Sequence, residues 1–243
     1  MVVRPDWGDT ACRWGAEQLA RKTIAYAAQS GWSVRDLYGD DATKAKIIAE
    51  LPSKTFASVL GHGNETTYTA QRQEVVLVKG DPDTDALCAK GGNLVMNFLT
   101  CLVGEDLLPY MIEKGLKAAK GYSEEFVFVT DPANFPDSVA EPFFRAHCEF
   151  DRVYLQTEDE DTAWDAEMAA WQEEYNKAPV TYRRYIAQDM DSSWLHKAGH
   201  EPPPEPQPSC PTSQWVVRNM GWKWLSRLRK IRKALFGIEP GYP

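Results

Sequence analysis

Cysteine and histidine are scarce in this chain of 243 residues, which holds five Cys and four His. The number of cysteines is odd, and no two of them stand at the C-x-x-C spacing of zinc and redox motifs. The pattern argues against a zinc site and against a disulfide scaffold, so we expect no metal. It favours a reducing, cytoplasmic setting in which one thiol is free to act as a nucleophile.

Long apolar runs are absent as well. The longest, residues 93–103, is shorter than the roughly 18 residues that a membrane-spanning helix needs, and Asn97 and Thr100 interrupt it. The first residues show no signal-peptide pattern. We therefore expect neither a membrane span nor export by the secretory route.

One long stretch near the end of the sequence is basic and holds no acidic residue. Residues 207–238 contain seven Lys and Arg and no Asp or Glu, although the whole chain has a net charge of −8. The rest of the chain then holds 20 basic against 35 acidic residues, a net charge of −15. Such a surface repels phosphate, so we expect no nucleic-acid partner.

Apolar runs alternate with amphipathic stretches along most of the chain, which is typical of a parallel α/β sheet. Helices are predicted over residues 12–31, 43–51, 105–120, 138–151 and 159–177, and strands over 1–5, 32–37, 55–60, 93–99 and 126–129. Residues 64–92 are more polar and predict less regular structure. With 43% hydrophobic residues, the chain has ample material for a core, and we expect one α/β domain over residues 1–200.

A proline-rich linker is predicted over residues 201–213, with six prolines between 201 and 211. The remaining residues, 214–243, predict a basic helical tail whose apolar side chains recur at spacings of three and four over 215–236. Three roles for this tail stay open: docking on the acidic domain, lying on an anionic membrane surface, or packing on a partner protein.

Two short motifs carry the chemistry. Gly61-His62-Gly63 follows the apolar strand 55–60, and Cys101 follows the apolar strand 93–99. In a parallel sheet, functional groups gather where the strands end, so neighbouring strands would bring His62 and Cys101 to one edge. An imidazole there can take the thiol proton and later protonate a leaving amine. The amides of Gly63 and Cys101 are candidates for holding the developing oxyanion.

The chain resembles the caspase-like cysteine peptidases of clan CD, and among them the gingipain-like branch. The resemblance extends over residues 1–177 and rests on "VRDLYGDDATKAKIIAEL" (34–51), "GHGN" after the strand "FASVL", "TC" after "NLVMNFL", and "LLPYMIEKGLKAAKGYSEEFVF" (107–128). It implies a three-layer sandwich with a mainly parallel sheet and helices on both faces. It also implies peptide-bond hydrolysis through a thioester acyl-enzyme without a cofactor, with Cys101 as nucleophile and His62 as base and acid.

Some features depart from the family pattern or leave it open. Many relatives have small residues after the nucleophile, whereas Leu102 and Val103 follow here. The family often reads a basic substrate side chain, and Glu65, Glu105 and Asp106 are the acidic candidates for binding one. The alternative function is a catalytically inactive caspase-like scaffold that recruits a partner through its C-terminal helix.

Overall fold

Short apolar strands build the central sheet. In the computed structural model, which describes residues 1–6, 10–130 and 138–199, six strands lie in the order β2-β1-β3-β7-β8-β9. The first five are mutually parallel and β9 is antiparallel to β8. Their bounds are β1 (Val2–Arg4), β2 (Asp36–Tyr38), β3 (Phe56–Leu60), β7 (Val95–Leu99), β8 (Ala118–Tyr122) and β9 (Ser193–Lys197).

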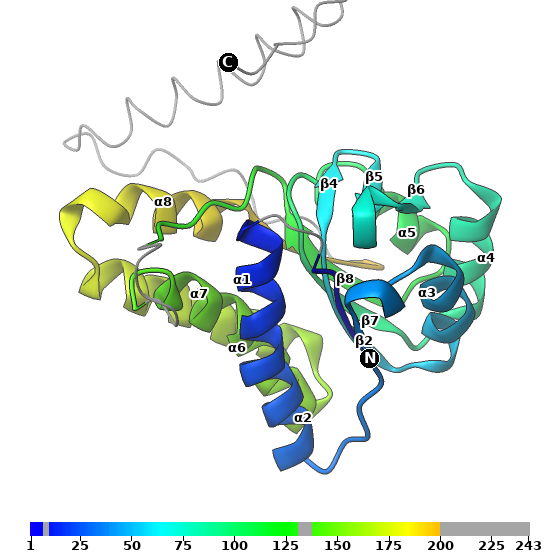
Figure 1. Cartoon of the computed structure of the whole chain (residues 1–243), viewed down its shortest axis with the longest axis horizontal. Coiled ribbons are helices and arrows are strands. Elements are labelled where there is room, and N and C mark those ends of the chain that lie inside the picture. Colours follow the sequence, from blue (N-terminus) through cyan, green and yellow to red (C-terminus); the bar gives the residue numbers. More distant parts are fainter. Residues whose placement is uncertain (7–9, 131–137, 200–243) are drawn as a thin grey trace, which may run out of the picture. The chain divides into compact units, whose positions relative to one another are not determined.

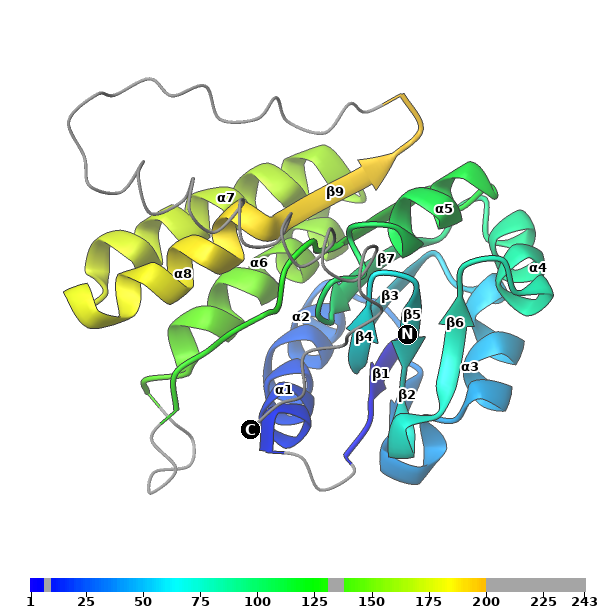
Figure 2. The ribbon, with the colours of Figure 1, turned by 90° about the horizontal axis from the view of Figure 1, so that it is seen from above.

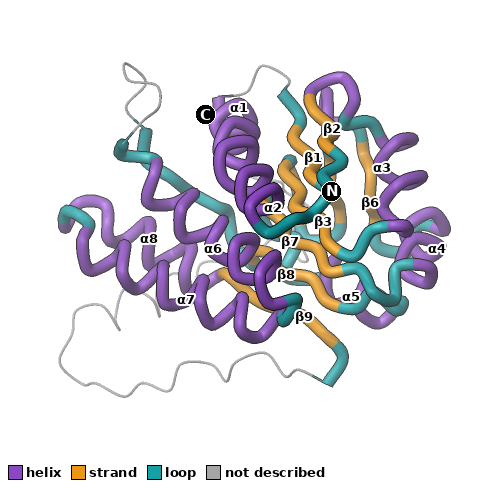
Figure 3. Tube along the Cα trace, turned by 90° about the horizontal axis from the view of Figure 1, so that it is seen from below, coloured by secondary structure: helices purple, strands orange, loops and turns teal. Residues whose placement is uncertain are grey.

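Both faces of this sheet are covered, as expected for parallel strands without polar alternation. In β3, Ala57 and Val59 pack into one apolar core, while Phe56 and Leu60 face the opposite side. Figure 1 and Figure 3 show α3 (Lys44–Glu50), α4 (Pro82–Lys90) and α5 (Leu107–Glu113) on one side of the strands. The other side carries α1 (Thr10–Leu19), α2 (Ala25–Gln29), α6 (Glu141–Thr157), α7 (Glu160–Lys177) and α8 (Val180–Ser192). The expected α/β class with a mainly parallel sheet between helices is confirmed, and the arrangement is compatible with a three-layer sandwich.

The polar region 64–92 is more regular than expected. It contributes to a second, antiparallel sheet of β4 (His62–Asn64), β5 (Thr67–Thr69) and β6 (Val75–Val78), and it contains the helix α4 (Figure 2). Tyr68 of β5 is fully buried and its hydroxyl donates to the Leu60 carbonyl at 2.8 Å. One buried aromatic therefore attaches this small sheet to the end of β3.

Of the two elements predicted after β7, the helix is shorter than expected and the strand is not formed. The expected helix 105–120 ends at Glu113, because Gly115 adopts a φ of +108° and the next apolar residues form β8. The expected strand 126–129 pairs with no strand, and residues 123–130 instead run as a half-buried strap beside α8. The strand propensity of residues 126–129 gave the wrong prediction, because residues 118–122 form the strand that pairs with β7.

Other boundaries shift by a few residues. The helix predicted over 12–31 is a continuous segment made of α1, a π-helical turn at Ala20–Ile24, and α2, and Gly31 follows it at a φ of +78°. The strand expected at 32–37 begins only at Asp36. The helix expected at 138–151 continues to Thr157, and the one expected at 159–177 is confirmed as α7. The sequence reasoning missed α8 and β9.

The predicted linker 201–213 and tail 214–243 lie outside the described residues. The chain divides into two compact units, and the first, Met1–Pro202, contains every described residue. Among the helices that the structure describes, none is long and apolar enough to cross a bilayer.

A charged cluster lies buried between the sheet and the second helix layer. Lys120 Nζ of β8 lies 2.6 Å from Glu167 Oε1 of α7, and both side chains are fully buried. Lys120 Nζ and the Tyr122 hydroxyl also lie 3.0 Å and 2.8 Å from His147 Nδ1. Burial lowers the pKa of Lys120 and of His147 and raises the pKa of Glu167. The cluster fixes α6 and α7 to β8.

Candidate functional site

The pairing of β3 with β7 sets the position of both predicted motifs. Leu60 lies directly opposite Leu99 in the parallel ladder, and the Gly61 amide donates to the Leu99 carbonyl at 3.4 Å. His62 and Cys101 each follow that registered pair by two residues. The two motifs therefore leave the sheet at the same height, from neighbouring strands at one edge.

The two glycines beside His62 are required by close contacts. A Cβ atom on Gly61 would lie 2.0 Å from the Thr69 carbonyl oxygen, so no other residue fits there. A Cβ atom on Gly63 would lie 2.6 Å from Thr100 Cγ2 and 2.9 Å from the Cys101 carbonyl oxygen. The Gly63 backbone is thus packed directly on the loop that carries Cys101.

The sulfur atom in contact with the His62 imidazole is that of Cys12. His62 Nε2 lies 3.3 Å from Cys12 Sγ, and the Thr69 hydroxyl donates to the His62 carbonyl at 3.2 Å. Cys12 belongs to the first turns of α1 and is only 1% exposed. The loops that carry His62 and Cys101 thus share one edge of the sheet, and the thiol that contacts the imidazole is that of Cys12.

Cys12 was missed in the sequence reasoning, although a topological signal was available. A helix that follows a strand of a parallel sheet begins at the carboxyl edge, where the predicted site lies. Gly15 of α1 packs so closely on β3 and β7 that an added Cβ would lie 2.7 Å from a Leu60 methyl and 3.4 Å from a Leu99 methyl. Cys12 is one helical turn nearer the edge than Gly15.

Cys101 lies in a partly exposed turn directly after β7. Burial raises the pKa of its thiol to about 11, while the backbone N–H groups of Phe126 and of Cys101 itself act in the opposite direction. Leu102, the next residue, has a φ of +63°, in the left-handed region that bulky side chains rarely adopt. The Val103 amide donates to the Cys101 carbonyl at 2.8 Å, so the chain turns directly after the thiol.

The acidic candidates occupy two loops that touch each other. The Leu107 amide donates to the Glu65 carbonyl at 2.8 Å, which joins the loop after β4 to the start of α5. Glu65 and Glu105 are half-buried, whereas Asp106 is exposed and lies 3.5 Å from Lys79 Nζ. The structure brings these three residues together beside the loops of His62 and Cys101.

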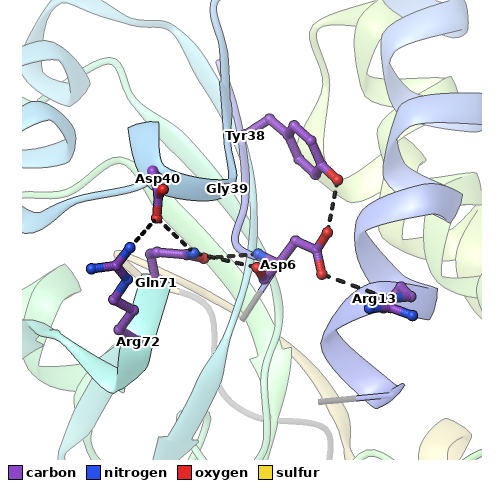
Figure 4. Close-up of a pocket in the computed structure, with 7 residues that line it drawn as sticks. All are labelled: Asp6, Arg13, Tyr38, Gly39, Asp40, Gln71 and Arg72. Carbon is purple, nitrogen blue, oxygen red and sulfur yellow. Dashed lines mark hydrogen bonds and ion pairs between the residues drawn. The ribbon is translucent and has the colours of Figure 1, made fainter. Parts of the chain in front are cut away.

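A polar pocket of about 480 Å³ opens where β1 and β2 end, on the same edge of the sheet (Figure 4). Asp6 lies in its wall, where it accepts a hydrogen bond from the Tyr38 hydroxyl at 2.8 Å and lies 3.8 Å from Arg13. On the other side, Asp40 accepts from Gln71 at 3.2 Å and from Arg72 at 2.9 Å. The sequence reasoning did not select these two carboxylates, because the strands that place them are short and weakly patterned.

Comparison with protein-family models gives no match, and comparison with curated proteins gives none either. Within residues 1–6, 10–130 and 138–199, no group of three or more His, Cys, Asp or Glu side chains is arranged to hold a metal ion.

Proposed function

We propose that this chain is a caspase-like cysteine peptidase, with Cys101 as nucleophile and His62 as general base and acid. One observation carries the proposal: the register of β3 and β7 delivers Gly61-His62-Gly63 and Thr100-Cys101 to the same edge, with Gly63 packed on the Cys101 carbonyl. The mainly parallel sheet with helices on both faces accords with the sandwich that the family resemblance implies.

The reaction begins with transfer of the Cys101 thiol proton to the His62 imidazole. The sulfur then attacks the carbonyl carbon of the scissile peptide, and the amides of Gly63 and Cys101 are the proposed donors to the resulting oxyanion. The C–N bond breaks as the imidazolium returns its proton to the leaving amine. A water molecule, deprotonated by His62, then hydrolyses the thioester and regenerates the thiol.

The electrostatics favour proton transfer during the reaction over a permanent ion pair. With a pKa of about 11, the Cys101 thiol is protonated at neutral pH, so His62 must remove its proton in the attacking step. In the resting structure His62 Nε2 contacts Cys12 Sγ. For catalysis, the His62 imidazole must therefore turn away from Cys12 and towards Cys101.

We propose a basic substrate side chain before the scissile bond. The edge of the sheet is lined by carboxylates on both sides of the motif loops. Glu65, Glu105 and Asp106 lie on one side, and Asp6 lies in the pocket beside α1. A fluorogenic peptide panel ending in Arg, Lys, Asp or Asn tests this, and cleavage confined to Asp or Asn would overturn the basic preference.

Variants of three cysteines test the assignment of the nucleophile. We expect Cys101→Ala and His62→Ala to abolish hydrolysis of the cleaved peptide, because each removes one partner of the dyad. We expect Cys12→Ala to remain active, and Cys88→Ala, which alters a buried thiol in α4, serves as the matched control. Full activity in Cys101→Ala would refute the proposal.

A second candidate is the inactive caspase-like scaffold. It is supported by the contact of His62 Nε2 with Cys12 Sγ and by the raised pKa of the Cys101 thiol, because a protonated thiol is a poor nucleophile. If no peptide of the panel is cleaved by the purified chain, this candidate replaces the peptidase. Recruitment of a protein partner or of an anionic membrane would then fall to residues 215–236.

For the tail and the location of the chain, the predictions from sequence stand as proposals. We propose a cytoplasmic protein whose basic tail, residues 214–243, is able to hold it at an anionic surface. Flotation with anionic liposomes, with and without residues 207–243, tests this role. Equal flotation of the two chains would rule out membrane binding by the tail.

A further inference from the structure

Helix α1 covers the face of the sheet on which the two motif residues are expected. Leu60 and Leu99 belong to one apolar cluster together with residues of α1. His62 and Cys101 each follow one of these leucines by two residues, and side chains alternate along an extended chain, so both are expected on the same face. The His62 imidazole therefore shares this face with two thiols, those of Cys12 and Cys101.

The packing of α1 holds the Cys12 thiol against the imidazole. Its Sγ lies 3.3 Å from His62 Nε2, within range for a hydrogen bond that involves sulfur. Gly15, about one turn further along α1, lets the helix approach the sheet so closely that an added Cβ would lie 2.7 Å from a Leu60 methyl. The Thr69 hydroxyl donates to the His62 carbonyl at 3.2 Å. Both partners of the contact are therefore held in place by their own surroundings.

The position of Cys12 suits a hydrogen-bond donor better than a second nucleophile. The residue is only 1% exposed, so a substrate peptide has no access to its sulfur. Burial also favours the neutral form of a thiol, and a neutral S–H can donate to an unprotonated ring nitrogen. While Nε2 of His62 accepts that hydrogen bond, the same nitrogen is not available to accept the proton of Cys101.

We propose that Cys12 is a positioning residue that holds the His62 imidazole in a resting orientation, turned away from Cys101, so that this contact must break before the nucleophile is activated. The inference rests on the proposed function, since that function gives His62 the role of base. A thiol is a weak hydrogen-bond donor, so the resting orientation is only moderately favoured. The active orientation is then a minor state whose population the Cys12 thiol sets.

The test is the rate at which iodoacetamide alkylates Cys101 at pH 7.5, measured by mass spectrometry on the full chain. Cys12→Ala removes the donor, and an imidazole released towards Cys101 takes its proton and raises the share of reactive thiolate. We expect alkylation to become roughly threefold to tenfold faster, the population change that one hydrogen bond accounts for. Cys12→Ser keeps a donor and should stay within about twofold of the unmodified chain. Cys88→Ala, which alters a buried thiol in another apolar core, is the matched control and should leave the rate unchanged.

Removing His62 as well separates this role from a structural one. If Cys12→Ala only loosened the packing around Cys101, alkylation would also be faster in Cys12→Ala/His62→Ala than in His62→Ala alone. We expect no gain there, because the imidazole is needed to take the proton.

Three results would overturn the proposal: a gain that persists without His62, an unchanged or slower rate in Cys12→Ala, or rapid alkylation of Cys12 itself in the unmodified chain. Should Cys12→Ala fail to fold, Cys12→Val fills the space of the thiol without supplying a donor, and the same acceleration is expected.

These rates are separate from peptide hydrolysis. If the purified chain cleaves no peptide but Cys12→Ala accelerates alkylation through His62, the resting contact stands and the proposed function falls. If peptides are cleaved and Cys12→Ala is alkylated at the rate of the unmodified chain, the resting contact falls and the peptidase stands.

Discussion

Substituting Gly63 by Ala is the sharpest test of how the two motif loops fit together. The added Cβ would lie 2.6 Å from Thr100 Cγ2, 2.8 Å from Val103 Cγ1 and 2.9 Å from the Cys101 carbonyl oxygen. The Thr100 and Val103 methyl groups could move only within a packed core, and the Cys101 carbonyl oxygen could move only with the backbone. The loops of His62 and Cys101 must therefore move apart.

We expect this separation to cost about 1–3 kcal/mol of unfolding free energy, the usual range for overpacking a filled site. We expect a larger effect on hydrolysis, about 10²-fold, because a displacement near 1 Å between reacting groups has that consequence. Urea unfolding and initial rates on the best peptide of the panel measure the two quantities separately.

Gly92→Ala is the matched control. Gly92 is exposed, and an added Cβ would have the Gly115 carbonyl oxygen as its nearest atom, at 3.9 Å. We expect its stability to stay within about 0.5 kcal/mol and its activity to be unchanged. Equal stability and equal activity in Gly63→Ala and Gly92→Ala would refute the close packing of the two loops.

Three further predictions follow from the described contacts. Lys120→Ala should lose about 3–5 kcal/mol in chemical denaturation, because Glu167 is left buried without its partner, and a loss below 1 kcal/mol would contradict the buried pair. The double variant Lys120→Met/Glu167→Gln should recover most of that loss, since neither residue then has to be charged inside the core. The alkylation rate of Cys101 should rise about tenfold per pH unit from pH 7 towards 10, because its raised pKa of about 11 leaves the thiolate scarce at neutral pH. A plateau already near pH 7 in that mass-spectrometric profile would show a preformed thiolate instead.

The sequence was sufficient to predict the parts of the fold that depend on local patterns. The apolar runs 55–60 and 93–99 are the buried strands β3 and β7, and the amphipathic stretch 159–177 is α7. The edge of the sheet that holds His62 and Cys101 follows from those strands alone. These elements are predictable because hydrophobic periodicity reports on burial directly.

The remaining features depend on contacts between distant segments. The run 126–129 has the composition of a strand, yet the sheet is completed by 118–122, whose Lys120 is stabilised inside the core by Glu167. No local sequence pattern predicts that Lys120 pairs with Glu167 inside the core. Likewise, Cys12 lies 50 residues from His62 in the sequence, and only the return of α1 to the carboxyl edge brings its sulfur to 3.3 Å.

Covalent trapping tests most directly whether Cys101 is the nucleophile of the proposed peptidase. The full chain is treated with a peptidyl acyloxymethyl ketone based on the best-cleaved peptide, and the modified residue is located by mass spectrometry. We predict a single adduct on Cys101 that disappears in His62→Ala, with Cys12 unmodified. An adduct on Cys12, or equal labelling of Cys101 with and without His62, would contradict it.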